Sequence, residues 1–508
     1  MEVLIAAAKF WTLFYASVVI LNLFTKVQSR SGVGNQTTEK CPQRCTCDTD
    51  SKTVNCMNAG FKLVPSDISP DTRSLILDGN IFRHLRGSSF RNLHSLSNLS
   101  LRNCQINQIH AAAFEPFSDT LRALWMSNNT LTKKKYKFPS SMRNIELLDM
   151  SATGRKNYHD IYHRLFNLKY LYLANNFISA FPPSLPSSTL TVLDVSQNIL
   201  KNFSFNILSK QYLNVKTLRL GVNSIGKLEN NSFLHFRNLE HLDLSYNQIS
   251  EAQPLAFRSK SLKYINLYGT NFRLDQNNWN IFHEVPNIER INMSFCRFKY
   301  GNLTRSAFRD LRKLTELDLS GTEIASLSRV FSNLPNLERL RLSSNPMSTL
   351  EGADLKGVED SLRELDVSSG RLSTISFESL PLKVWKNLKV VDFSDNPFLC
   401  DCNFIWLRHW LTRANASQVK VRGWNNYYCL TSKGQVNMFK LNRPSDTDCF
   451  QDPLFEDPCI VVLLLLTLLI WITASSASAV HRFRWHLRYW YFMKTVSSLN
   501  YIYILCNL

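Results

Sequence analysis

The most constraining feature of this 508-residue chain is a pattern, LxxLxLxxNxL, that recurs along residues 72–398. One clear copy runs from Leu239 to Ile249. Successive copies are 22 to 26 residues apart, and the asparagine-type position falls at 80, 104, 129, 153, 176, 198, 223, 247, 270, 296, 322, 345, 370 and 396. Fourteen copies in phase indicate an array of structural repeats.

The residue types of the pattern predict the architecture of each repeat. The two leucines of LxL alternate with polar positions, as a short strand with one buried face requires. Stacked copies form a parallel sheet in which each repeat is buried only by its neighbours. We therefore expect an α/β fold: a leucine-rich repeat solenoid of about 14 repeats over residues 71–397, with a parallel sheet on its concave side.

Two further positions of the repeat are expected to be internal. The asparagine turns inward and binds backbone groups, because a buried amide is tolerated only when it is hydrogen-bonded. Cys104 and Cys296 take this position in two copies, and we interpret both as buried structural thiols. Six phenylalanines lie about ten to twelve residues beyond the asparagine and predict a spine under the convex side: Phe90, Phe114, Phe233, Phe257, Phe282 and Phe308.

Cysteine clusters flank the repeats, over residues 30–70 and 398–450. An open-ended solenoid needs caps, and disulfides persist in oxidising compartments. A zinc site is the competing interpretation, but no histidines accompany the clusters. The expected disulfide cysteines are Cys41, Cys45, Cys47, Cys56, Cys400, Cys402, Cys429 and Cys449.

Sequence does not determine which cysteines pair. Because adjacent bridging within Cys-x-Cys is strained, our prediction is the alternate order: 41 with 47, 45 with 56, 400 with 429, and 402 with 449.

The two ends of the chain indicate a membrane topology. Residues 1–29 have a lysine, an apolar run and a small-residue cleavage site, which predict a signal peptide, with a membrane anchor as the alternative. After a linker at 451–459, the charge-free segment 460–480 predicts a transmembrane helix. Basic residues after it make 481–508 a short cytoplasmic tail. We expect a single-pass type I protein at the plasma membrane or in endosomes, with an extracellular ectodomain.

Tyrosines at exposed positions of the repeats are the candidate ligand contacts, because a rigid ring supplies contact area and one polar group. Strand propensity is the alternative explanation. The candidates are Tyr170, Tyr172 and Tyr264 on the concave sheet, with Tyr246 and Tyr268 flanking.

A basic run at Lys133, Lys134, Lys135 and Lys137 makes nucleic acid or an anionic lipid a weaker candidate partner. Eight sequons predict a glycoprotein: Asn35, Asn98, Asn128, Asn202, Asn230, Asn292, Asn302 and Asn415.

Scattered histidines and the lack of a Gly-rich phosphate loop or a Ser/His/Asp arrangement give no catalytic constellation. We expect neither an enzyme nor a cofactor.

The stretch His481–Met493 is rich in basic and aromatic residues, among them Arg482, Arg484, Trp485, Arg488 and Trp490. It resembles the juxtamembrane stretch that precedes the TIR domain of invertebrate Toll-like receptors, and the single carboxy-terminal cap resembles the single-cysteine-cluster branch of that family. The resemblance implies innate immunity, an extracellular protein or microbial ligand, and signal transduction through homo- or heterodimers with Toll-like receptors.

One departure from the family concerns the carboxy-terminal tail. Only Lys494–Leu508 follows the juxtamembrane stretch, too short for a TIR domain, so the chain as written is expected to bind and pair without signalling. The alternatives are an adhesion or guidance receptor and a decoy receptor.

Overall fold

The structure is a computed structural model. It describes residues 41–131, 142–156, 165–181, 189–201, 214–272, 281–296, 302–303, 308–327, 329–416, 419–431, 434–440 and 458–505.

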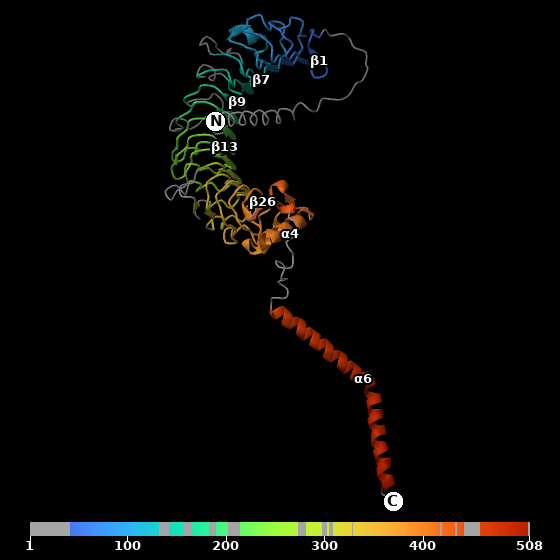
Figure 1. The fold of residues 1–508 in the computed structure, drawn as a ribbon. Coiled ribbons are helices and arrows are strands. Elements are labelled where there is room, and N and C mark those ends of the chain that lie inside the picture. Colours follow the sequence, from blue (N-terminus) through green and yellow to red (C-terminus); the bar gives the residue numbers. More distant parts are fainter. Residues whose placement is uncertain are drawn as a thin grey trace, which may run out of the picture. The chain divides into compact units, whose positions relative to one another are not determined.

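The chain divides into two compact units. Unit 1 comprises residues up to Ser224 together with His235–Leu239, and unit 2 comprises Ile225–Leu234 and the residues from Glu240 onward. Each unit is built around its own ladder of short strands (Figure 1).

In unit 1 the hairpin of β1 and β2 starts the ladder, and seven parallel strands follow, drawn blue to green in Figure 1. The strands are β1 (Thr46–Asp48), β2 (Thr53–Asn55), β3 (Ser74–Ile76), β5 (Asn98–Ser100), β7 (Ala123–Trp125), β8 (Leu147–Asp149), β9 (Tyr170–Tyr172), β10 (Val192–Asp194) and β11 (Thr217–Arg219). A side pair, β4 (His84–Leu85) with β6 (Gln108–Ile109), and a 3-10 helix η1 (Ala111–Phe117) complete the described elements of this unit.

In unit 2 the strands of the main ladder are all parallel. They are β13 (His241–Asp243), β15 (Tyr264–Asn266), β16 (Arg290–Asn292), β18 (Glu316–Asp318), β20 (Arg339–Arg341), β21 (Glu364–Asp366), β22 (Val390–Asp392) and β24 (Lys420–Val421). Two side pairs are β12 (Lys227–Leu228) with β14 (Glu251–Ala252), and β17 (Asn302–Leu303) with β19 (Ser326–Leu327).

Each ladder has one buried and one exposed face, as the alternation predicts. The central residue of a strand, such as Leu218 or Leu340, is completely buried, whereas its two neighbours point outward. A repeat thus gains its core only when the next repeat covers its leucines.

The expected class and repeat number need correction. The repeats form a β-solenoid of about 12 turns. Among the described residues, most segments between the repeat strands are turns and short 3-10 pieces, and one short α-helix, α3 (Leu382–Asn387), lies between β21 and β22. The repeats are therefore a β-solenoid rather than the expected α/β class.

The asparagine ladder supplies the polar part of the core. The amide nitrogen of Asn129 donates to the carbonyl oxygens of Leu101 (2.8 Å) and Met126 (2.9 Å). Its side-chain oxygen accepts from the amides of Cys104 (3.1 Å) and Ile106 (2.8 Å). The same donor pattern recurs at Asn80, Asn176, Asn198, Asn223, Asn345 and Asn396. One side chain therefore joins two consecutive turns.

The predicted phenylalanine spine is present in both units. In unit 1 the rings of Phe90 and Phe114 stack at 6.1 Å. In unit 2 Phe233, Phe257, Phe282 and Phe308 stack in sequence at 5.9, 5.5 and 6.0 Å. All six rings are at most 2% exposed.

The residue before the asparagine-type position is left-handed in every repeat. Its φ is 53° to 57° at each non-glycine copy and 63° to 75° at Gly79, Gly269 and Gly321. Asparagine and glycine adopt this conformation readily, but a bulky side chain there costs about 1–2 kcal/mol. Val222, Tyr246 and Phe295 carry that strain.

Disulfides close both caps. Cys41 pairs with Cys47 and Cys45 with Cys56, and in the carboxy-terminal cap Cys400 pairs with Cys429. This is the alternate order; Cys402 is also disulfide-bonded, while Cys449 lies outside the described residues.

The carboxy-terminal cap packs helices against the last repeats of unit 2. The last repeat contributes η2 (Phe377–Ser379) and α3 (Leu382–Asn387). The cap itself comprises β23 (Phe398–Leu399), α4 (Cys402–Ala416), η3 (Trp424–Asn426), β25 (Tyr428–Thr431), β26 (Gly434–Asn437) and η4 (Met438–Lys440). The buried Tyr427 hydroxyl accepts the amide of Phe393 at 3.0 Å, which ties this cap to the last repeat.

Helix α6 (Pro458–Leu505) contains the segment expected to cross a membrane. No helix in the described parts of the chain is both long and apolar enough for a membrane span. The spanning helix expected at 460–480 is therefore not confirmed. The apolar run that suggested it is one part of a longer helix, which continues without a break through Arg482 and Arg484.

Candidate functional site

The exposed face of the unit 1 ladder carries a row of uncharged side chains. In the strand register, Ala123, Leu147, Tyr170 and Val192 stand beside one another on four consecutive strands. Tyr170 is 39% exposed. We call Trp125, Leu147, Tyr170, Tyr172 and Val192 the aromatic face.

Charged groups alternate with Trp125 and Tyr172 along one side of the row, since Asp149 stands between the two aromatic residues and Asp194 follows Tyr172 in the strand register. The Arg102 guanidinium lies 5.2 Å from the centre of the Trp125 ring and within 4 Å of Asp78 (3.7 Å) and Asp149 (3.9 Å). Further along the same border, Arg219 binds Asp194 at 3.3 Å.

On the opposite border, Glu146 contacts Lys169 at 2.9 Å and Arg122 at 4.0 Å. The borders are thus charge-compensated, and the row between them is apolar.

The Tyr172 hydroxyl is expected to remain neutral on this face. Burial raises the pKa of Tyr172, and Asp194 and Asp149 add to the increase although Arg219 opposes it. The ring can therefore offer a ligand a hydrogen-bond donor as well as apolar area.

The exposed face of the unit 2 ladder is different, because charged side chains dominate it. Arg341 binds Glu316 (2.7 Å) and Glu364 (3.3 Å) on the two flanking strands. Arg339 also binds Glu316 (3.1 Å), and Arg422 from the cap binds Glu364 (2.7 Å). We call Glu316, Arg339, Arg341, Glu364 and Arg422 the charged network.

The protonation of the charged network follows from these contacts. Burial acts to raise the pKa of Glu316, but the hydrogen bond and charge of Arg341, helped by Arg339, lower it overall. Arg341 is affected in the complementary sense: burial disfavours its charge, and Glu316 and Glu364 raise its pKa overall. Both groups are ionised and satisfied by each other.

Tyr264 lies on the exposed face of unit 2, at the other end of that ladder from the cap. The Arg290 guanidinium lies 5.1 Å from its ring centre on the next strand, and the His241 ring lies 6.2 Å away on the preceding strand. Burial raises the pKa of Tyr264 to about 12. A neighbour on either side leaves this ring less available than Tyr170.

Tyr246 and Tyr268 were expected to flank the sheet, and the structure places both in the turns that follow β13 and β15. Their rings lie 5.0 Å apart, and Tyr268 is 5.4 Å from Phe295, which sequence reasoning missed. The sequence does show Phe295 as a third aromatic residue. It lies two repeats after Tyr246 and, like Tyr246, directly before the asparagine-type position of its own repeat.

Two predicted sequons project from the exposed sheet faces. Asn98 is the first residue of β5 and Asn292 the third residue of β16, each next to a buried leucine or isoleucine. Asn128 and Asn230 are exposed in turns. Strands β7 to β11 of unit 1 carry no sequon within the strands, and the sequon of Asn128 lies in the turn just after β7.

Several predicted residues lie outside what the structure describes: Asn35, Asn202, Cys449 and the lysine run Lys133, Lys134, Lys135 and Lys137. The backbone of Asn302 is in β17 and that of Asn415 in α4, and their side chains are not described. The juxtamembrane candidates Arg482, Arg484, Trp485, Arg488 and Trp490 are exposed on α6.

The two lone cysteines lie where the repeat pattern predicts. Cys104 and Cys296 are completely buried, and each thiol contacts a backbone carbonyl of the preceding turn at 3.2 Å. Burial raises the pKa of Cys104 to about 12 and that of Cys296 to about 11. Neither thiol can react while its repeat stays folded.

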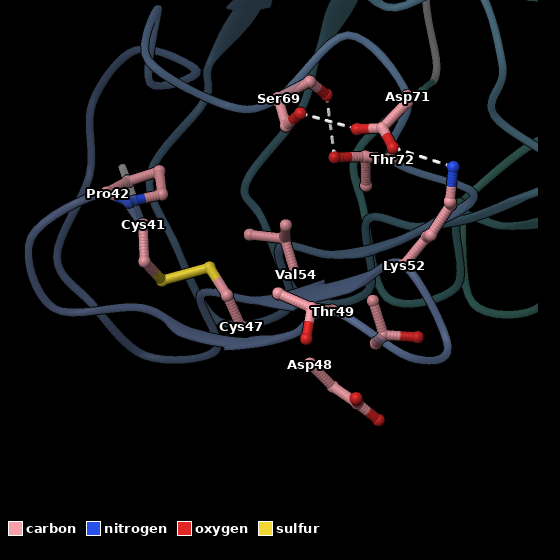
Figure 2. Close-up of a pocket in the computed structure, with 11 residues that line it drawn as sticks. Cys41, Pro42, Cys47, Asp48, Thr49, Lys52, Val54, Ser69, Asp71 and Thr72 are labelled. Atoms are coloured by element: carbon pink, nitrogen blue, oxygen red, sulfur yellow. Dashed lines mark hydrogen bonds and ion pairs between the residues drawn. A yellow bond between two sulfur atoms is a disulfide. The ribbon is translucent and has the colours of Figure 1, made fainter. Parts of the chain in front are cut away.

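A small pocket in the amino-terminal cap is lined by Cys41, Cys47, Lys52, Asp71 and their neighbours (Figure 2). Lys52 binds Asp71 at 2.7 Å, and Ser69 donates to the same carboxylate. These polar groups satisfy one another, so we interpret the pocket as part of the cap.

Comparison with known proteins identifies the repeats. The leucine-rich repeat family pattern matches residues 167–188, 213–272 and 299–347. The chain carries leucine-rich repeats.

The curated relatives include podocan-like protein 1, CD180 antigen and a Toll-like receptor. Mouse podocan-like protein 1 is 25% identical over 70% of this chain and 79% of its own length. Mouse CD180 antigen is also 25% identical, over 73% of this chain and 57% of its own length. Chicken Toll-like receptor 2 type-2 is 28% identical over 56% of this chain. This chain spans little more than half of CD180 antigen and 32% of the chicken receptor.

Solved structures agree on the fold. The LRIM1/APL1C complex matches with a TM-score of 0.53 and 17% identity over 82% of this chain and 74% of that chain. The Drosophila Toll–Spatzle complex matches with a TM-score of 0.50 and 20% identity over 75% of this chain and 52% of that chain.

Proposed function

We propose that this protein is an extracellular binding receptor of Toll-like type that holds a protein or microbial ligand on the aromatic face of unit 1 and does not catalyse a reaction. The observation that carries the proposal is the uncharged row Leu147, Tyr170 and Val192, which lies between borders whose charges are already paired. Apolar area of this kind is the part of a surface that a ligand gains most by covering.

Three further observations support this placement. No sequon lies within strands β7 to β11, so glycans at Asn98 and Asn128 would border the row without starting from it. Disulfide caps fit an oxidising compartment. The likeness to chicken Toll-like receptor 2 type-2 and, in fold, to Toll in its complex with Spatzle supports a receptor function.

The test uses the full-length chain, purified and immobilised, with three soluble probes: a lipopeptide, a single-stranded RNA and Spatzle-type cytokine. We expect one probe to bind and the Tyr170→Ser/Tyr172→Ser variant to weaken it by at least about tenfold, since one interface tyrosine contributes about 1–2 kcal/mol. Glu338→Gln is the matched control, because it changes an exposed charge in unit 2. Equal affinity of the tyrosine variant and the unchanged chain would exclude the aromatic face.

A matrix-adhesion function is the second candidate, and the match to most of the length of podocan-like protein 1 favours it. An adhesion protein is expected to be retained on decellularised matrix and to ignore all three soluble probes. Measuring retention of the same immobilised preparation separates the two functions.

A further inference from the structure

Three aromatic side chains form a continuous exposed edge along unit 2. Tyr246 and Phe295 are 44% and 52% exposed, and Tyr268 lies between them with its ring turned 62° and 61° to theirs. We call Tyr246, Tyr268 and Phe295 the aromatic ladder. It lies in the turns that follow the strands, and it is separate from the aromatic face of unit 1.

The outer rings, those of Tyr246 and Phe295, each pack one face against a glycine of the following turn. A Cβ built on Gly321 would be 2.8 Å from two adjacent ring atoms of Phe295 and 3.3 Å from its Cγ. A point above the ring face has distances of this kind, whereas a point beyond the ring edge would be much farther from Cγ.

A Cβ built on Gly269 would likewise be 3.2 and 3.3 Å from two adjacent ring atoms of Tyr246 and 3.8 Å from its Cγ. Each outer ring therefore has one face against the backbone and the other toward solvent.

The conformation of these residues indicates a function for the rings. Tyr246 and Phe295 have φ values of 53° and 57°, in the left-handed region that Asn103, Asn128 and Asn175 occupy at the same repeat position in unit 1. Bulky residues are disfavoured there, and exposed aromatic rings gain nothing from the core. Backbone strain that is kept at exposed rings, which pack only on a glycine and on one another, indicates a functional constraint.

The chemistry of the ladder narrows the class of ligand. The three rings and the residues beside them, Gly269, Ser294 and Gly321, are uncharged, in a chain of net charge +19. A polyanion would be drawn to basic surfaces instead. Two ring faces with the same outward orientation, two repeats apart, are separated by about 10 Å, twice the spacing of neighbouring strands.

We propose that the aromatic ladder binds an uncharged β-linked glycan. In such a chain alternate sugar rings present the same face at a similar spacing, so one sugar stacks on Tyr246 and the next but one on Phe295. Tyr268, edge-on between them and hydrogen-bonded to Tyr246, lies beneath the intervening sugar. Coiled α-linked glycans do not place alternate rings in this way.

The test measures binding of hexasaccharides to the full-length chain by titration calorimetry. Chitohexaose and cellohexaose are the β-linked probes, maltohexaose is the α-linked probe, and heparin reports polyanion binding. We expect at least one β-linked probe to bind and maltohexaose not to bind. Tyr246→Asn or Phe295→Asn should each weaken binding about tenfold, and the double variant should abolish it.

Asparagine is the informative replacement because it relieves the left-handed strain. The double variant should unfold at an unchanged or higher temperature, which separates loss of binding from loss of folding. Ser344→Asn, at the same turn position with a φ of 57°, is the matched control and should bind as the unchanged chain does.

Three results would overturn the proposal: neither β-linked probe binds, heparin alone binds, or the double variant binds normally. A double variant that loses self-association in sedimentation while glycan binding is absent would assign the ladder to contact between copies. Tyr170→Ser/Tyr172→Ser should leave glycan binding intact, so this proposal and the proposed receptor function can fail separately.

Discussion

The two units share one core and differ in the face they expose. In both, buried leucines, bridging asparagines and stacked phenylalanines repeat at the same positions. The exposed strand positions of unit 1 carry Leu147, Tyr170 and Val192, whereas those of unit 2 carry Glu316, Arg339 and Glu364. The repeat pattern dictates only the inward positions, so the outward positions are free to specialise, toward contact in unit 1 and toward mutual charge pairing in unit 2.

The largest expected effect tests whether the cores are equivalent. Phe114→Ala in unit 1 and Phe257→Ala in unit 2 should each cost about 3–5 kcal/mol, because both rings are fully buried in the stacked spine. Hydrogen exchange, followed peptide by peptide, measures the loss in each unit. A cost in one unit several times that in the other would break the equivalence.

A smaller effect should appear in unit 2 alone. Arg341→Gln leaves Glu316 and Glu364 with one arginine each, and should cost about 1–3 kcal/mol because these carboxylates are largely buried. Arg219→Gln is the matched change in unit 1. Its side chain is 46% exposed and makes a single pair, so about 0–1 kcal/mol is expected. Thermal unfolding of the two variants gives the comparison, and equal losses would show that the network adds nothing beyond isolated pairs.

Acid should weaken unit 2 through Glu316, by less than the Arg341 replacement does. Its folded pKa lies below the ordinary 4.5, so folding favours the ionised carboxylate. The stabilisation is complete above pH 4.5 and is lost as pH falls through the lower folded pKa.

Asp392 acts in the opposite sense, because burial raises its pKa. Glu316→Gln isolates the contribution of Glu316. Unfolding temperatures measured between pH 3 and 6 should depend less steeply on pH in this variant, and an unchanged slope would contradict the assignment.

The smallest effect concerns the tyrosines themselves. Tyr170→Ser should change stability by no more than about 0.5 kcal/mol, because the side chain is exposed on the sheet. Tyr264→Ser should cost more, since its ring is largely buried beside Arg290 and His241. Denaturant unfolding of the pair measures the difference. A larger cost at Tyr170 would mean that the aromatic face is structural.

The inward residues were predictable from sequence because stacking of the repeats leaves each of them only one possible position and set of contacts. Asn129 must bridge two turns and Phe257 must stack between its neighbours, so period and residue type were sufficient. The alternate cysteine order followed from the geometry of Cys-x-Cys. The partners of Arg341 could also have been predicted, because Glu364 and Glu316 lie 23 and 25 residues away in the sequence. They become apparent only when the outward positions of successive repeats are aligned as rows.

Other features could not be read from the repeat. The period places Tyr246 directly before Asn247, but it does not show that the ring packs on Gly269. The contact of Phe295 with Gly321 spans two turns and depends on ring orientation.

The buried thiols have a practical consequence for folding. Cys104 in unit 1 and Cys296 in unit 2 are buried free cysteines. Thiol–disulfide exchange requires a thiolate. Both buried thiols are therefore unreactive in the folded protein and react only while their own turn is open. The rate at which a maleimide labels each position therefore times the opening of each unit separately, without an introduced probe. The same chemistry confines disulfide scrambling to the interval before the asparagine ladder closes.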